Sequence, residues 1–168
     1  SHLLEVDSSG IVYQSCSELP METIAAAHSF LDRQESLAIW HAAYHDLGES
    51  IVYANPFFCE TFGLTLDDVL ERRRYHLVNP PDTTTETIAQ YKAEDRQAME
   101  DGYFLQRSPV GDNRGIVVLK LRFDQGILGM FKFVDSDLPG PLNDPNDLDA
   151  DFRSVVELVK NYQSGKSC

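Results

Sequence analysis

The stretch that decides the fold runs from residue 103 to residue 134 and reads YFLQRSPVGDNRGIVVLKLRFDQGILGMFKFV. Turn-forming residues at 110–113 and 125–126 divide it into three runs that are rich in β-branched and aromatic side chains. Runs of this kind, separated by short turns that contain Gly, Asp or Asn, are typical of antiparallel strands in a meander. We therefore predict three adjacent strands, at 103–108, 115–124 and 127–134.

The middle strand of this meander alternates charged and apolar side chains over its second half. Successive side chains of a strand point to opposite faces of the sheet. We therefore expect Lys120 and Arg122 to face water. The side chains expected to point inward are Val117, Leu119, Leu121 and Phe123, so that one face of the sheet is apolar.

The residues before the meander predict two further strands and a group of helices. Strand formers occupy 37–44 and 50–54, with a turn between them. Asn55-Pro56 ends the second strand in the way a helix begins, because Asn accepts a hydrogen bond from a free amide of the first turn and Pro at N1 gives up no needed donor. We predict three helices, from Pro56 to about Phe62, from a capping box at Thr65 and Asp68 to about Glu71, and from 85 to 100.

Together these elements predict an α+β fold. It consists of a five-stranded antiparallel sheet with short helices on one face, plus flanking N- and C-terminal helices. We assign 1–35 to an N-terminal arm and flanking helix, 36–135 to the domain, 136–149 to an exposed linker rich in Pro, Asp and Asn, and 150–168 to a C-terminal amphipathic helix. The apolar stripes of the flanking helices pack either on the chain's own sheet or on a second copy. In the second case the dimer-interface candidates are Ile24, Ala27, Leu31, Val155 and Val159.

The composition argues against several classes of function. Of 168 residues, 14 are Lys or Arg and 27 are Asp or Glu, and the formal charge of -13 opposes binding to nucleic acid. The three cysteines, Cys16, Cys59 and Cys168, show neither CxxC nor zinc spacing, so no disulfide framework or metal site is predicted and a reducing, cytoplasmic setting is expected. No segment approaches the roughly 18 apolar residues needed to span a bilayer, so no membrane partner is expected.

The order of elements resembles the PAS family of sensory domains, and three motifs support the resemblance. Tyr53-Ala54-Asn55-Pro56-Phe57-Phe58, followed by Gly63-Leu64, is similar to the family's Tyr-x-Asn-x-x-Phe segment and the Phe-Gly-Tyr after it. Residues 77–82 are similar to its Leu-x-x-Pro-x-Asp turn. Gly111-Asp112-Asn113 stands where the family has the hairpin between its third and fourth strands. The resemblance covers residues 36–135, and it departs from the family at 135–137, which read Asp-Ser-Asp in place of Asp-Ile-Thr.

The resemblance implies a sensory or regulatory module for signal transduction without catalytic residues. Such modules form homodimers, bind a small molecule between sheet and helices, and control an attached or partner output domain such as a kinase, a cyclase or a transcription factor. The candidate pocket-lining residues are Trp40, Tyr53, Phe58, Phe62, Tyr75, Leu77, Phe104, Leu119, Leu121 and Phe133. Two alternatives stay open: these side chains fill the core of a purely structural dimerisation domain, or the scaffold carries an enzyme.

The cofactors of light- and gas-sensing relatives are not expected in this chain. Flavin-binding relatives carry a reactive Cys after the second short helix, where this chain reads Arg73-Arg74-Tyr75-His76-Leu77. Haem-binding relatives take an axial His from the longer helix, and 85–100 contains none, which leaves only His76 nearby. His41 and His45 lie on a predicted strand and turn, where their spacing of four does not bring them to one metal. We find no nucleophile elbow, phosphate loop or dinucleotide motif.

Overall fold

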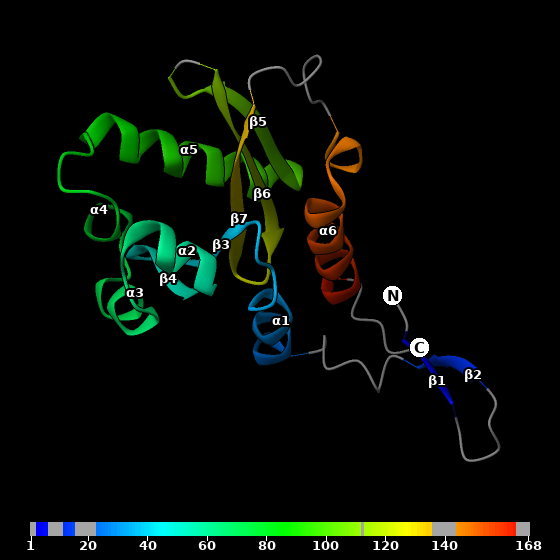
Figure 1. Cartoon of the computed structure of the whole chain (residues 1–168). Helices are drawn as coiled ribbons and strands as arrows, with labels where there is room; N and C mark the ends of the chain where they lie inside the picture. Colours follow the sequence, from blue (N-terminus) through cyan, green and yellow to red (C-terminus); the bar gives the residue numbers. More distant parts are fainter. Residues whose placement is uncertain (1–2, 7–11, 16–22, 112, 136–143, 164–168) are drawn as a thin grey trace.

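The centre of the molecule is a five-stranded antiparallel sheet, shown in the computed structural model of Figure 1. The structure describes residues 3–6, 12–15, 23–111, 113–135 and 144–163. The strands are β3 (Ala38–His45), β4 (Gly48–Ala54), β5 (Tyr103–Pro109), β6 (Arg114–Phe123) and β7 (Gly126–Asp135), in the order β4-β3-β7-β6-β5. A separate pair, β1 (Leu3–Val6) and β2 (Val12–Ser15), is also antiparallel. The predicted α+β class and its PAS-like sheet are thus confirmed.

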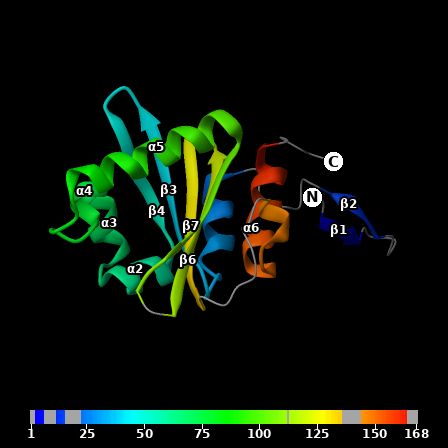
Figure 2. The ribbon, with the colours of Figure 1, turned by 90° about the horizontal axis from the view of Figure 1, so that it is seen from above.

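Helices cover both faces of the sheet (Figure 2). One face carries α2 (Pro56–Phe62), α3 (Leu66–Arg72), α4 (Tyr75–Val78) and α5 (Thr85–Asp101). The other face, which we call the back face, carries α1 (Ile24–Leu31) and α6 (Ala150–Gln163). The alternating apolar residues of β6 from Val117 to Phe123 belong to the core on the back face. The sequence placed the short helices on one face and left open whether α1 and α6 pack on this sheet or on a second copy, because the short-range pattern does not show where they dock.

The prediction that Lys120 faces water is wrong. Only 2% of Lys120 is exposed, and it lies on the face that α5 covers. The period-two alternation of β6 is as predicted, but carboxylates of α5 stand opposite Lys120 and make its burial possible. Arg122, two residues further on, is exposed as predicted and donates a hydrogen bond of 2.8 Å to the carbonyl of Met99.

Asn55 joins the end of β4 to the start of α2 and is fully buried. Its side-chain oxygen accepts hydrogen bonds from the amides of Phe58 (2.9 Å) and Ile39 (3.0 Å). Its amide nitrogen lies within hydrogen-bond distance of three carbonyl oxygens, those of Leu31, Gln34 and Leu37. The predicted N-cap is confirmed, and the same side chain also holds the connection from α1 to β3 against the sheet.

Two of the other helix boundaries also follow from local sequence. Gly63 ends α2 in the left-handed region, with φ +67°, which favours glycine. Thr65 and Asp68 form the predicted capping box at the start of α3. The short helix α4 was not predicted, because it spans only four residues and its cap, Arg74, makes no side-chain hydrogen bond there.

The described end of the predicted linker is not fully exposed. A short 3-10 helix, η2 (Pro145–Asp147), precedes α6, and Pro145 and Leu148 are buried. Lys132 of β7 lies 2.8 Å from a carboxylate oxygen of Asp149 and of Asp151. Residues 136–143, Cys16, Cys168 and the predicted start of the N-terminal helix lie outside the described residues.

A polar cluster on the back face ties α1 to the sheet. Nε2 of His28 lies 3.0 Å from Nδ1 of His41, which is 1% exposed on β3. The Tyr53 hydroxyl donates to Asp32 Oδ1 (2.5 Å) and also lies 3.1 Å from the carbonyl of His28. The two imidazoles can share only one proton across this contact, so their hydrogen bond requires that they are not both charged.

We expect this cluster to make the stability depend on pH. Burial, followed by the charge of His28, lowers the pKa of His41 to about 4, while Asp124 opposes the shift. An unfolded His titrates near pH ~6.5, so the unfolded state binds more protons between these two values. The stability is therefore present above pH ~6.5 and is lost as the pH falls, by about 2 kcal/mol at pH ~5. Urea unfolding at a series of pH values measures it.

A matched pair of variants separates this effect from the titration of carboxylates. His41→Gln should flatten the loss of stability between pH ~6.5 and ~5, because the group that takes up the proton on unfolding is gone. His45→Gln changes an exposed residue at the end of the same strand and should leave the slope as it is. A slope that is equal in all three proteins would contradict the assignment to His41.

Candidate ligand-binding site

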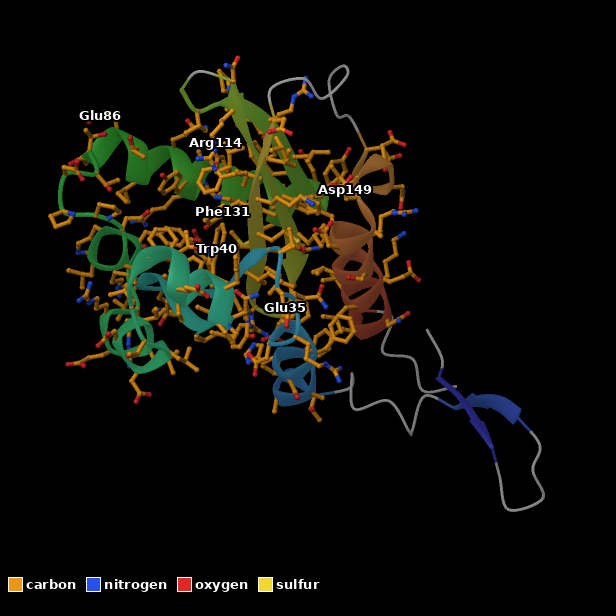
Figure 3. The ribbon with its side chains drawn as sticks, viewed as in Figure 1. Glu35, Trp40, Glu86, Arg114, Phe131 and Asp149 are labelled. Atoms are coloured by element: carbon orange, nitrogen blue, oxygen red, sulfur yellow. The ribbon has the colours of Figure 1, made fainter. Side chains whose placement is uncertain are left out.

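A pocket of about 510 Å³ lies between the sheet and the helices α2, α4 and α5. This volume is in the range of small-molecule sites, which are mostly apolar with a few placed polar groups. Its apolar lining consists of Trp40, Ile51, Phe58, Phe62, Val78, Pro80, Ile116, Val118, Phe131 and Phe133. Its polar lining consists of Thr61, Tyr75, Asn79, Thr83, Tyr91, Glu94, Gln106, Ser108 and Lys120. Figure 3 shows Trp40 and Phe131 between α2 and α5.

Four rings form a continuous aromatic wall in the pocket, namely Trp40, Phe58, Phe62 and Phe131. Neighbouring ring centroids are 5.8 Å apart for Trp40 and Phe58, 4.5 Å for Phe58 and Phe62, and 6.1 Å for Phe62 and Phe131. The ring centroids of Phe131 and Trp40 are 6.3 Å apart, so each of the four rings has two neighbours in the wall. Such tilted and edge-on pairs are favourable and restrict one another's rotamers. The wall is therefore a preformed surface on which a flat apolar group can lie.

The indole of Trp40 lies over a position of β7 that has no side chain. Trp40 pairs with Gly129 in the register of β3 and β7. A Cβ atom on Gly129 would stand 2.3 Å from Cζ2 of the indole. The glycine thus creates the space that the ring occupies, and it fixes the depth of the pocket at the aromatic wall.

The ammonium group of Lys120 forms the polar end of the pocket. Its Nζ lies 2.8 Å from Asp95 Oδ1, 3.0 Å from Glu94 Oε1 and 3.1 Å from the carbonyl of Tyr91. The same atom stands 5.7 Å from the ring centroid of Trp40, so the polar end adjoins the aromatic wall. An ammonium group has three donor hydrogens. The carbonyl of Tyr91 accepts one hydrogen bond, and the two carboxylates form ion pairs with the same group.

Asp95 organises the groups behind Lys120. It is fully buried, and its Oδ2 accepts hydrogen bonds of 2.5 Å from the hydroxyls of Tyr44 and Tyr75. The Tyr75 hydroxyl in turn accepts a bond of 3.1 Å from Nε1 of Trp40. Burial, followed by the charge of Asp95, raises the pKa of both phenols, which keeps them protonated as donors. The chain from Trp40 to Lys120 is therefore a connected polar network beside an apolar pocket.

A second buried carboxylate, Glu49 of β4, holds α4 in place. Its Oε2 accepts a hydrogen bond of 3.1 Å from the backbone amide of Tyr75. Its Oε1 lies 3.4 Å from Nζ of Lys92 and 3.6 Å from the Arg74 guanidinium. This contact orients the first turn of α4, from which Tyr75 reaches both Asp95 and Trp40. Glu49 is thus a positioning residue for the pocket wall.

The structure brings five of the ten predicted pocket residues into the pocket, namely Trp40, Phe58, Phe62, Tyr75 and Phe133. Phe133 is 43% exposed, which places it at the edge of the pocket. Tyr53, Leu119 and Leu121 belong to the core on the back face, Phe104 packs beside the pocket without lining it, and Leu77 is 48% exposed. The strand residues were misplaced because the sequence showed a buried face without showing which helices cover it.

The polar end of the pocket was not predicted from the sequence. Asp95 lies one helical turn from Tyr91 and from Ala98, on the apolar stripe of α5, and Lys120 interrupts an apolar strand. A single carboxylate on the apolar stripe of a helix and a single ammonium group within an apolar strand each need an opposite charge when they are buried. This need is the signal in the sequence that could have indicated the pair. Neither residue belongs to a short motif that would mark it in the sequence.

The candidate cofactor ligands do not converge. Cys59 is buried on α2, and burial raises the pKa of its thiol. His76 is exposed, and His41 contacts His28 and not His45. Among the described residues no group of three or more His, Cys, Asp and Glu side chains is placed to hold a metal ion. In the same part of the chain, none of the helices is long and apolar enough to cross a membrane.

The candidate dimer residues lie in the core on the back face. Ala27, Leu31, Val155 and Val159 are buried there, and Ile24 packs at its margin. In this arrangement the two stripes face the chain's own sheet. A dimer that used these same side chains would need α1 or α6 to leave that core, so the dimer interface stays a prediction.

Comparisons with known proteins do not assign a family. No family model matches the chain, and no curated protein matches it. Among solved structures, the chain is similar to an IclR family transcriptional regulator from Brucella abortus, with 17% sequence identity and a TM-score of 0.31. That match covers 98% of this chain and 74% of the other. A TM-score this low carries no argument about fold or function.

Proposed function

We propose that the chain is a sensory or regulatory module of the PAS type, which binds a small ligand in the pocket and passes its occupancy to an attached or partner output. The observation that supports this most is the open pocket of about 510 Å³ beside a connected polar network. A pocket of this volume with a mostly apolar lining and a few placed polar groups is typical of small-molecule sites. The proposal assigns the module no catalytic residue.

The sheet offers a route from the pocket to the back face. On β6, Val118 and Lys120 line the pocket. The alternate residues Leu119 and Leu121 point to the opposite face and pack in the core with α1 and α6. A ligand that prefers one arrangement of Lys120 and α5 would therefore also change the packing of the back-face helices. This is a population shift, and its size is limited by the difference in the ligand's affinity for the two arrangements.

The test is a thermal-shift screen of metabolites against three proteins. A ligand of the pocket raises the melting temperature of the wild type in proportion to its occupancy. Val118→Trp places an indole in the pocket and should abolish the shift. Val110→Trp makes the same change at an exposed position outside the pocket lining and should keep it. If no compound shifts the wild type, or if Val118→Trp responds equally, ligand binding in this pocket is ruled out.

Homodimer formation is the second part of the proposal, and light scattering of the same samples tests it. The expected mass is twice that of one chain, with or without ligand. Because the stripes of α1 and α6 are occupied within the chain, we expect Leu31→Asp to destabilise the fold and not only the dimer. A monomeric wild type at all concentrations would remove dimerisation from the proposal without affecting the ligand test.

A further inference from the structure

The charges in the pocket restrict the chemistry of its ligand. Among the described residues that line it, Glu94 and Lys120 are the two with charged side chains. The fully buried Asp95 stands directly behind Lys120, so one ammonium group faces two carboxylates. The cluster therefore carries a formal charge of -1, and the positive charge within it is already neutralised.

Lys120 cannot serve as an anion site without giving up one of its partners. Its Nζ donates a hydrogen bond to the carbonyl of Tyr91 and forms ion pairs with Asp95 and Glu94. A ligand carboxylate or phosphate that reached Lys120 would have to displace Glu94 and leave that carboxylate unpaired beside it. Burying an unpaired charge in such a place is strongly unfavourable.

Glu94 is the negatively charged group in the pocket lining, and it can accept a further hydrogen bond. Its Oε1 pairs with Lys120 and its Oε2 accepts a bond of 3.3 Å from Nε2 of Gln90, whereas each carboxylate oxygen can accept two. Asp95 by contrast does not line the pocket: it is fully buried behind Lys120, and its Oδ2 accepts from both tyrosines. Glu94 thus presents a carboxylate with spare acceptor capacity to the pocket space.

The aromatic wall favours the same kind of ligand. Trp40, Phe58, Phe62 and Phe131 offer flat apolar surfaces, and the faces of such rings attract cations and repel anions. The remaining polar lining, which includes Thr61, Asn79 and Thr83, is uncharged. A ring system can rest on the wall while a donor group attached to it reaches Glu94.

We propose that the pocket selects flat, ring-containing molecules that carry an amine, and that it excludes carboxylates and phosphates of the same shape. This proposal rests on the proposed function and narrows its ligand to one chemical class. The ammonium group of the ligand donates to Glu94, and the ring lies on the aromatic wall. Lys120 keeps its partners and serves to hold Glu94 in position.

Three probes that share one ring test the selection. They are 2-(1-naphthyl)ethylamine, 2-(1-naphthyl)ethanol and 1-naphthaleneacetic acid, titrated by calorimetry into the full chain. We expect the amine to bind about tenfold more tightly than the alcohol, as for one charge-assisted hydrogen bond, and the acid to bind most weakly. In Glu94→Gln the preference for the amine should disappear, while the alcohol keeps its affinity within about threefold. Glu100→Gln, exposed on the same helix, should behave as the wild type.

Different results of these titrations would contradict the ligand class alone, the binding of any ligand, or the location of the site. If the acid binds as tightly as the amine, or if Glu94→Gln leaves the preference unchanged, the ligand class is wrong while ligand binding in the pocket stands. If none of the probes binds the wild type and the metabolite screen gives no shift, both proposals fail. If binding persists undiminished in Val118→Trp, the probes occupy another place, and the assignment to this pocket is overturned.

Discussion

Replacing Gly129 by alanine should lower the free energy of unfolding by about 3 kcal/mol or more. The new Cβ would stand 2.3 Å from Cζ2 and 2.5 Å from Cε2 of the Trp40 indole, closer than any real contact of such atoms. The ring cannot yield easily, because its Nε1 donates to Tyr75 and the rings of Phe58 and Phe131 lie next to it. Either the indole leaves the sheet or β7 shifts, and both disrupt the core.

The change can be followed at the residue itself, because Trp40 is the single tryptophan of the sequence. Its emission should shift to the red in Gly129→Ala as the indole gains contact with water. Circular dichroism during urea unfolding gives the loss of stability.

A double-mutant cycle is the control for this prediction. In the background of Trp40→Leu, the alanine at position 129 meets a smaller, flexible side chain, and its cost should fall below about 1 kcal/mol. The difference between the two backgrounds measures the coupling of the two sites. An equal cost in both would show that the strand requires glycine for a reason other than the indole, and would contradict the role given to Gly129.

Local sequence predicted the parts of the fold that depend on neighbours in the chain. Asn55-Pro56 starts α2, Gly63 ends it, and Thr65 with Asp68 starts α3, because caps are made by residues within one turn of each other. The first turn of the meander lies where it was predicted, and the second lies at Asp124-Gln125, one residue before the predicted 125–126. For such features the deciding interactions span three or four residues, which a single sequence shows directly.

The parts that were missed depend on which elements meet across the sheet. Leu119 and Leu121 were predicted to line the pocket and lie on the back face, because alternation identifies two faces of a strand without showing which helices cover each. Lys120 was placed in water because its partners are carried by α5, 25 and more residues away in the sequence. Long-range pairing of charges leaves no local pattern, so the polar end of the pocket could only be seen once the elements were docked.

Replacing Lys120 by methionine should cost about 3–5 kcal/mol of stability, because it removes one partner of a buried ion pair. Methionine fills nearly the same volume, so the loss is electrostatic: Asp95, fully buried, would keep the donors Tyr44 and Tyr75 but lose its positive partner. Glu94 would lose the ammonium group as well. The free energy of unfolding in urea measures the cost, and Lys160→Met, at an exposed site on α6, should change it by less than about 0.5 kcal/mol.

The matched rescue removes the charges that Lys120 neutralises. In the triple variant Lys120→Met, Asp95→Asn, Glu94→Gln, no unpaired charge is left, while an amide oxygen at position 95 can still accept from Tyr44 and Tyr75. We expect it to recover more than about half of the lost stability, because neutral groups are far less costly to bury than ions. A loss below about 1 kcal/mol in Lys120→Met, or no recovery in the triple variant, would contradict the buried ionic cluster, since packing of the lysine stem would then explain the energetics better than its charge.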